Sequence, residues 1–239
     1  MTRLKSILYH LLWESLDWLF PPSCVECHQI GSRWCKSCQS KVDIIKKPYC
    51  VKCGIPLDNE SNSLCHQCSS YTPSFQALRS WATFHDGMRS ALHSLKYENN
   101  QALGETFSHK LYEIISQENW QIDAVIPVPI SQDRLSQRGY NQAALIAYPL
   151  ALLLGKEYLK DGLIKQKDTR SQVGLSLRER RENVADAFYA KTKAVKGKII
   201  LVIDDVATTC STLDSCAKTL VNSGSNQVFC LTVARALTT

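Results

Sequence analysis

The sequence predicts an α/β protein in which a parallel sheet flanked by helices follows a short cysteine-rich segment. Three observations support this. From about residue 75 onward, strand-like and helix-like patterns alternate, as is typical of parallel sheets. Eight of the eleven cysteines lie between residues 24 and 68. Residues 198–213, KIILVIDDVATTCSTL, form an apolar strand that ends in two acids and a run of hydroxyl residues.

Residues 1–22 are expected to form an amphipathic helix. Leucine and isoleucine recur at helical spacing between Ile7 and Leu19, and two prolines at 21 and 22 end the pattern. Polar side chains interrupt the apolar stretch, which is too short to span a bilayer, so we expect neither a transmembrane segment nor a signal peptide. The helix either packs on the rest of the protein or contacts a membrane surface or a partner helix.

Residues 23–72 are expected to form a metal-binding module. Two thiolates on a tight turn can hold a tetrahedral metal ion, and two such turns complete a site of four cysteines, so four C-x-x-C pairs predict two structural zinc ions. Iron is the alternative metal. Adjacent pairs close the shorter loops, which favours sequential pairing over a cross-braced arrangement, although both stay open. In the sequential arrangement, one ion takes Cys24, Cys27, Cys35 and Cys38, and the other takes Cys50, Cys53, Cys65 and Cys68.

Residues 75–239 are expected to form the sheet and its helices. Strands are predicted at 77–84, 122–128, 199–203 and 228–233, and helices at 87–96, 102–115, 141–154 and 213–222. Polar groups that follow a buried parallel strand lie where open α/β sheets bind their ligands. The predicted ligand site is therefore at the carboxyl edge of this sheet.

The strongest site signal is the segment after the third predicted strand. Asp204 and Asp205 precede a loop of small residues that leads into a helix, and such a loop binds anions through its N–H groups, its hydroxyls and the helix dipole. The two carboxylates would repel a phosphate, so they suit sugar hydroxyls or a magnesium ion. This segment resembles the phosphoribosyl pyrophosphate (PRPP) loop of type I phosphoribosyltransferases. The resemblance implies that the acids hold the ribose hydroxyls and that Thr208, Thr209, Cys210, Ser211 and Thr212 cradle the 5′-phosphate.

Three further segments carry polar groups at suitable places. Residues 126–142 present Arg134, Arg138, Asn141 and Gln142 between a strand and a helix, an arrangement that can hold a pyrophosphate. Residues 168–188 contain Arg178 among several cations and form an expected loop over a bound anion. Residues 84–98 end a predicted helix with a lysine at position 96.

Together these segments resemble the ComF/ComFC family, which joins a double zinc ribbon to a type I phosphoribosyltransferase-like domain. The family pattern Pro-Val-Pro…Arg…Arg-Gly-aromatic-Asn-Gln fits 127–142, and a second pattern fits Thr169, Gln172, Leu175, Arg180 and Asn183. Cys210 is the one clear departure, because the family usually has glycine there. The resemblance implies a cytoplasmic protein that binds PRPP with Mg²⁺ and helps to move or use incoming single-stranded DNA in natural transformation, in contact with the DNA-uptake machinery. Asp204, Asp205, Arg138 and Arg178 are the residues expected to take part in any catalysis.

The charge of the chain and the absence of two common motifs restrict the classes of function that the sequence allows. The 239-residue chain has a net charge of +6, and residues 165–198 carry ten Lys/Arg and four Asp/Glu, so the excess is local and predicts weak, non-specific binding of single-stranded DNA. Neither a G-x-G-x-x-G nor a P-loop motif occurs, which argues against dinucleotide and P-loop ATP binding. Three functions stay open at this point: a PRPP-binding accessory protein of DNA uptake, an active phosphoribosyltransferase, and a zinc-ribbon binding module on a degenerate fold.

Overall fold

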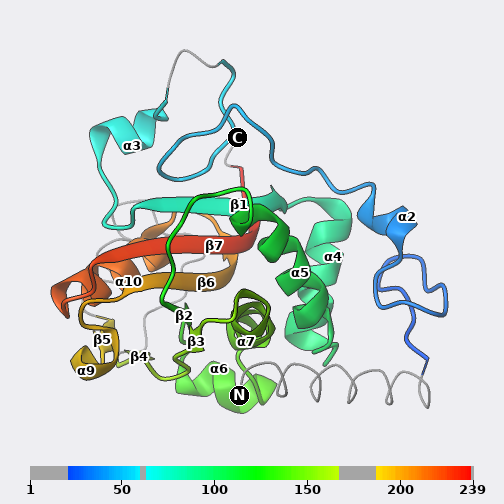
Figure 1. Ribbon diagram of the computed structural model, residues 1–239. Helices are drawn as coiled ribbons and strands as arrows, with labels where there is room; N and C mark the ends of the chain where they lie inside the picture. Colours follow the sequence, from blue (N-terminus) through cyan, green and yellow to red (C-terminus); the bar gives the residue numbers. More distant parts are fainter. Residues whose placement is uncertain (1–20, 60–62, 167–186, 238–239) are drawn as a thin grey trace.

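The computed structural model describes residues 21–59, 63–166 and 187–237 (Figure 1). Most of the expected N-terminal helix and of the expected loop at 168–188, Arg178 included, lies outside the described residues. Within the described ranges, no helix combines the length and the apolar character that crossing a membrane requires.

The centre of the fold is a five-stranded parallel sheet in the order β1-β7-β6-β2-β3. Its strands are β1 (Ala77–Thr83), β2 (Ala124–Pro127), β3 (Glu157–Tyr158), β6 (Ile199–Ala207) and β7 (Gln227–Arg235). A separate antiparallel pair joins β4 (Leu163–Lys165) to β5 (Phe188–Ala190). The predicted α/β class with a parallel sheet is confirmed.

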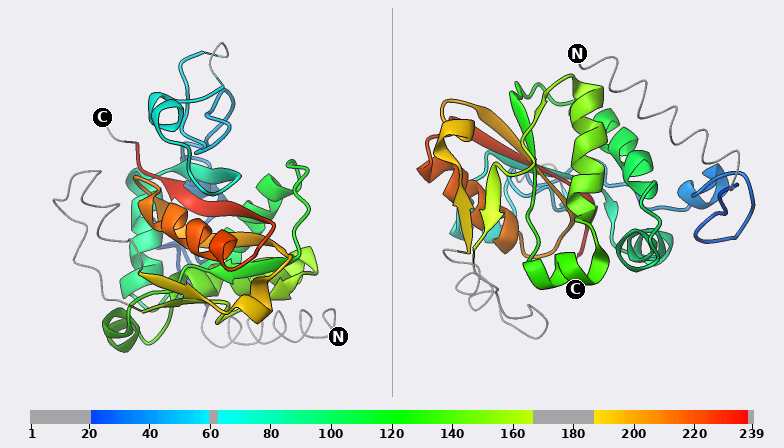
Figure 2. Two further views of the ribbon diagram at one scale, coloured as in Figure 1. Left: turned by 90° about the vertical axis from the view of Figure 1, so that its left-hand side faces the viewer. Right: turned by 90° about the horizontal axis from the view of Figure 1, so that it is seen from below.

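The helices cover both faces of the sheet. The longer ones are α4 (Asp86–Tyr97), α5 (Leu103–Ile115), α7 (Gln142–Leu154) and α10 (Ser211–Asn222). The shorter ones are α2 (Lys36–Gln39), α3 (His66–Ser70), α6 (Gln132–Arg138) and α9 (Thr192–Val195). Figure 2 shows α5 and α7 on one side of the sheet and α10 on the other.

Alternation along the strands builds two separate cores. Leu201 and Ile203 of β6 belong to the core that α4, α5 and α7 complete, whereas Ile200 and Val202 belong to the core that α10 completes. Successive side chains of a strand point to opposite faces, so a continuous apolar run serves a sheet that is buried on both sides.

The two cysteine groups pack on opposite faces of this sheet. Cys24 and Cys38 belong to the α5 side, where the Trp34 ring meets the rings of Trp81 and Phe107 edge-on at 5.8 Å each. Cysteines 50, 53 and 68 belong to the α10 side. There the Leu78 N–H of β1 donates to the Lys52 carbonyl at 2.7 Å, which fixes the second group directly to the sheet.

The boundaries around the acid pair differ from those expected. Strand β6 continues past Ile203 to Ala207, so Asp204 and Asp205 lie within the strand and not in the loop after it. The extension follows from pairing with β7, in which Asp204 stands opposite Thr232. Helix α10 likewise begins at Ser211, ahead of the expected start near position 213.

Candidate functional site

The acid pair lies at the carboxyl end of β6 and is joined to two other elements. Asp205 is 4% exposed, and its Oδ1 accepts a hydrogen bond from Gln142 Nε2 of α7 at 3.2 Å. Its Oδ2 forms an ion pair with Lys96 Nζ near the end of α4. Asp204 Oδ1 accepts from the Asp205 N–H at 2.9 Å. Strand β6, α7 and α4 therefore meet at the Asp205 carboxylate, with Asp204 beside it.

The two acids differ in their ionisation. Burial acts to raise the pKa of Asp205, but the ammonium group of Lys96 more than offsets this and holds that pKa below its usual value. Burial, together with the negative charge of Asp205, raises the pKa of Asp204 well above its usual value. A divalent cation, or a donor such as a ribose hydroxyl, would therefore contact the ionised carboxylate of Asp205. It would also favour ionisation of the neighbouring Asp204.

Arg138 is linked to the acid pair through Gln142. Its Nη1 donates to Gln142 Oε1 at 2.9 Å, and its Nη2 donates to the Tyr97 hydroxyl at 2.9 Å. The guanidinium also stacks on the Tyr97 ring, 4.7 Å from its centroid. Arg138 and Lys96 thus place two cations around one buried carboxylate, an arrangement suited to a diphosphate.

Capping interactions set the position of Arg138 and Gln142. Ser131 caps α6 by accepting from a backbone N–H, and Gly139 ends that helix with a φ of 78°. Asn141 then caps α7 through Ala143 N–H at 2.9 Å, while its own Nδ2 donates to the Val128 carbonyl at 2.9 Å. Two helices and the end of β2 are therefore locked together at this corner.

The hydroxyl-rich loop is short and tightly turned. Thr208 is exposed, the Thr209 and Ser211 hydroxyls lie 2.9 Å apart, and Cys210 has a φ of 63°. The left-handed region at Cys210 is where glycine is usual, so the chain keeps the glycine-like backbone without the glycine. The loop leads directly into Ser211 and Thr212 of α10, whose N-terminus suits an anion.

The thiol of Cys210 meets a buried arginine. Arg235, the last residue of β7, donates from Nη1 to Cys210 Sγ. Burial acts to lower the pKa of Arg235, but the sulfur atoms of Cys210, Cys53 and Cys65 raise it above the usual value. The cation is therefore retained in the core beside the loop.

The expected site residues have different positions in the structure. The acids, the residues 208–212 and Arg138 come together around one edge of the sheet. Arg134 lies one turn earlier on α6, is exposed, and makes no side-chain hydrogen bond or ion pair among the described residues. Arg178 lies outside the described residues. Sequence reasoning named Gln142 and Lys96 as polar groups of their segments but did not connect them with the acid pair, and it did not single out Arg235.

The eight paired cysteines form two groups with the geometry of metal sites. Cys24, Cys27, Cys35 and Cys38 make one group, and Cys50, Cys53, Cys65 and Cys68 make the other, with all sulfur atoms of a group within 4.8 Å of one another. This is the sequential arrangement and not the cross-braced one. Four thiolates at this spacing fit a tetrahedral zinc ion.

Comparison with known proteins agrees with this architecture. Residues 15–69 match the family described as double zinc ribbon domain, and residues 93–239 match the phosphoribosyl transferase domain. The chain is 30% identical to the DNA utilization protein YhgH of Escherichia coli O157:H7, over 82% of this chain and 88% of that one. It is 29% identical to competence protein F of Haemophilus influenzae, over 89% and 96%. It is 26% identical to competence protein ComFC of Bacillus subtilis, over 80% and 78%.

The chain therefore belongs to the phosphoribosyl transferase domain family and also carries a double zinc ribbon domain, and it is related to these competence and DNA utilization proteins. The resemblance to the ComF/ComFC family is confirmed, and two cysteine tetrads support structural zinc.

Proposed function

We propose that this protein binds PRPP together with Mg²⁺ at the carboxyl edge of the sheet. The observation that carries the proposal is the convergence at that edge of three features: an acid pair of which Asp205 is buried, two cations, and the loop of residues 208–212 with its glycine-like backbone, here called the anion loop. The residues 208–212 would hold the 5′-phosphate, and Asp204 and Asp205 would hold the ribose hydroxyls. Arg138 and Lys96 would face the pyrophosphate, and Arg134 would help only if α6 moves.

Ligand binding is expected to break the ion pair between Lys96 and Asp205. An incoming diphosphate competes with Asp205 for the Lys96 ammonium group, because phosphate oxygens carry more negative charge. Once the Asp205 carboxylate loses Lys96, it becomes a better acceptor for a ribose hydroxyl and a better partner for Mg²⁺. Binding of the two ends of PRPP is then mutually supportive.

In the cell, we propose that PRPP binding serves the handling of incoming single-stranded DNA in the cytoplasm. The support is the names of the relatives, which are competence and DNA utilization proteins, and the local basic excess at 165–198. Turnover would require a nucleophile to displace pyrophosphate from the ribose C1′, with the two cations stabilising the leaving group. Pyrophosphate release in the presence of candidate bases measures this turnover directly.

The binding proposal is tested by calorimetry on an Asp204→Asn, Asp205→Asn double variant. Hydrogen bonds to a charged group contribute about 1.5–3 kcal/mol each, so PRPP affinity should fall by at least about tenfold. Inorganic phosphate should bind as in the unaltered protein, because the loop is intact. Asp133→Asn, which changes an exposed acid on α6, is the matched control and should bind PRPP normally. Equal PRPP affinity in all three proteins would remove the acid pair from the site.

A further inference from the structure

A buried cation lies between the anion loop and the second cysteine tetrad. Arg235 is 1% exposed, and its Nε has no hydrogen-bond partner among the residues that the structure describes. Its backbone pairs with Ala207 on β6 and Thr83 on β1, so the side chain starts from a fixed point inside the sheet. A guanidinium in the core is costly unless negative charge lies close by.

The second tetrad supplies that negative charge. Arg235 contacts Cys210, and Cys210 lines a small cavity together with Cys53, whose Sγ lies 3.6 Å from that of Cys65. Four thiolates around a divalent ion leave a net charge of roughly −2, so a zinc-loaded tetrad is an anion that a buried guanidinium can balance. Arg235 therefore has the metal centre on one side and the Cys210 thiol, at the turn of the anion loop, on the other.

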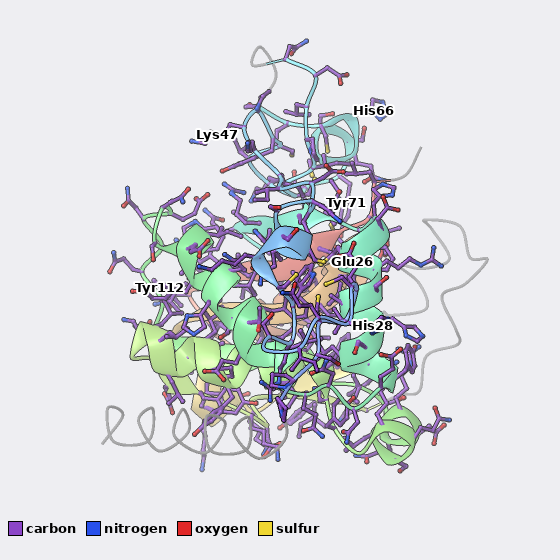
Figure 3. All side chains as sticks on the ribbon, turned by 90° about the vertical axis from the view of Figure 1, so that its right-hand side faces the viewer. Glu26, His28, Lys47, His66, Tyr71 and Tyr112 are labelled. Carbon is purple, nitrogen blue, oxygen red and sulfur yellow. The ribbon has the colours of Figure 1, made fainter. Side chains whose placement is uncertain are left out.

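A second connection joins the same two parts of the molecule. Asp214, in the first turn of α10, accepts from the Tyr71 hydroxyl at 2.7 Å and from the Ser74 N–H at 2.6 Å. Tyr71 directly follows α3, the helix that carries Cys68, and Figure 3 shows it between His66 of that helix and the sheet. A cavity of about 20 Å³ is the small space left between Cys53 and Cys68 on one side and Thr209 to Ser211 on the other.

We propose that the second zinc centre, acting through Arg235 and Cys210, holds the anion loop in its phosphate-binding conformation. This inference rests on the proposed function and makes Arg235 a positioning residue for the 5′-phosphate. Zinc at Cys50, Cys53, Cys65 and Cys68 then sets the affinity of the loop, whereas zinc at the first tetrad does not. The first tetrad packs on the opposite face of the sheet, around Trp34 and Trp81.

The first test separates the two ends of the PRPP site. Arg235→Gln removes the buried charge, and Arg235→Lys keeps it. Ribose 5-phosphate probes the loop, and pyrophosphate probes the cations on α4 and α6. Arg235→Gln should bind ribose 5-phosphate at least about tenfold more weakly and bind pyrophosphate unchanged, and Arg235→Lys should recover most of the loss. Equal losses for both ligands, or no loss for either, would overturn the proposal.

The second test needs no ligand and uses two matched cysteines. Cys35 and Cys65 are both partly buried and stand at the N-cap of the short helices α2 and α3. Cys35→Ser and Cys65→Ser should each lower the zinc content by about one ion per chain. Amide hydrogen exchange at 209–214 should rise in Cys65→Ser and stay unchanged in Cys35→Ser. The same rise in both variants, or in neither, contradicts the coupling.

Two outcomes keep this inference distinct from the proposed function. If the unaltered protein binds neither PRPP nor its fragments while exchange follows the expected pattern, PRPP binding is wrong and the coupling stands. If Cys65→Ser fails to fold, amide hydrogen exchange of the loop in Arg235→Gln is the deciding measurement, and Arg235→Lys is its control. Faster exchange in Arg235→Gln alone supports the proposal, whereas equal exchange in both variants refutes it.

Discussion

At the scale of single residues, Cys210 shows how a side chain can occupy a position that favours glycine. Its φ of 63° lies in the left-handed region, where a β-carbon costs about 1–2 kcal/mol. The hydrogen bond from Arg235 to its thiol offsets part of that cost. The substitution of cysteine for glycine therefore preserves the shape of the loop.

Two variants at position 210 distinguish the backbone strain caused by a β-carbon from the loss of the contact between the thiol and Arg235. Cys210→Gly and Cys210→Ala both lose the thiol, but only alanine keeps a β-carbon in the left-handed region. We expect Cys210→Ala to have a free energy of unfolding about 1 kcal/mol lower than that of Cys210→Gly. Urea unfolding measures the difference, and equal stability of the two variants would mean that the backbone relaxes at this turn.

The acid pair predicts opposite pH dependences at adjacent residues. The pKa of Asp204 is raised, so its stabilising contribution is present below the usual carboxyl pKa of about 3.9 and is lost as pH rises through the raised value. Asp204→Asn should therefore be more stable than the unaltered protein at neutral pH, and the difference should vanish in acid. The measurement is urea unfolding over a pH series without Mg²⁺.

Asp205 provides the internal comparison for this series. Its pKa is lowered by Lys96, so its contribution is present above the usual carboxyl pKa and is lost as pH falls through the lowered value. Asp205→Asn should thus be less stable than the unaltered protein at neutral pH. If both variants shifted stability in the same direction there, the assignment of the charge to Asp205 would be wrong.

At the scale of elements, the sequence predicted the strands and helices that a continuous local pattern of apolar residues determines. Four of the strands and the four longer helices follow from apolar runs and helical spacing. The extension of β6 through Asp204 and Asp205 depends on its partner strand β7, which a local pattern does not contain. The two-residue β3 and the three-residue strands β4 and β5 are short segments fixed by tertiary pairing, and none of them was predicted.

The same distinction between local patterns and tertiary contacts applies to the residues of the candidate site. The acids and the hydroxyl loop stand together in the sequence, so their spacing carried the signal. Lys96 and Gln142 lie far from them along the chain, and only the fold brings them to Asp205. The burial of Arg235 had one local sign, a cation at the end of the apolar strand VFCLTVAR, but most such cations reach solvent.

The contact between α5 and α7 makes a prediction at the same scale. A β-carbon on Gly104 would lie 2.5 Å from the Leu145 carbonyl oxygen, which belongs to rigid helix backbone. Gly104→Ala should lower the free energy of unfolding by about 1–3 kcal/mol. Gly87→Ala is the control, because there the three atoms nearest to the β-carbon belong to the end of the flexible Glu26 side chain. Thermal or urea unfolding of the two variants should differ clearly, and similar stabilities would show that the helices can separate at little cost.

At the scale of the whole molecule, the excess of positive charge at 165–198 predicts weak binding of single-stranded DNA that depends on salt. Each phosphate contact releases counterions, so affinity for single-stranded DNA should fall steeply between about 50 and 200 mM salt. Lys191→Glu with Lys193→Glu, two exposed residues within the basic segment, should weaken binding further. Lys46→Glu with Lys47→Glu makes the same charge change at exposed ribbon residues and should have a smaller effect. Salt-independent binding in fluorescence titrations would exclude an electrostatic origin.

The strand order has a consequence for synthesis on the ribosome. β7 comes last among the described strands, yet it lies between β1 and β6 and pairs with both. As the nascent chain emerges, all eight ribbon thiols leave the exit tunnel before this interior strand exists, so they can capture zinc while the surfaces that later cover most of them are still incomplete. Metal loading can therefore precede burial, and a nascent chain stalled before Gln227 would carry loaded ribbons beside a sheet in which β1 is still separated from β6.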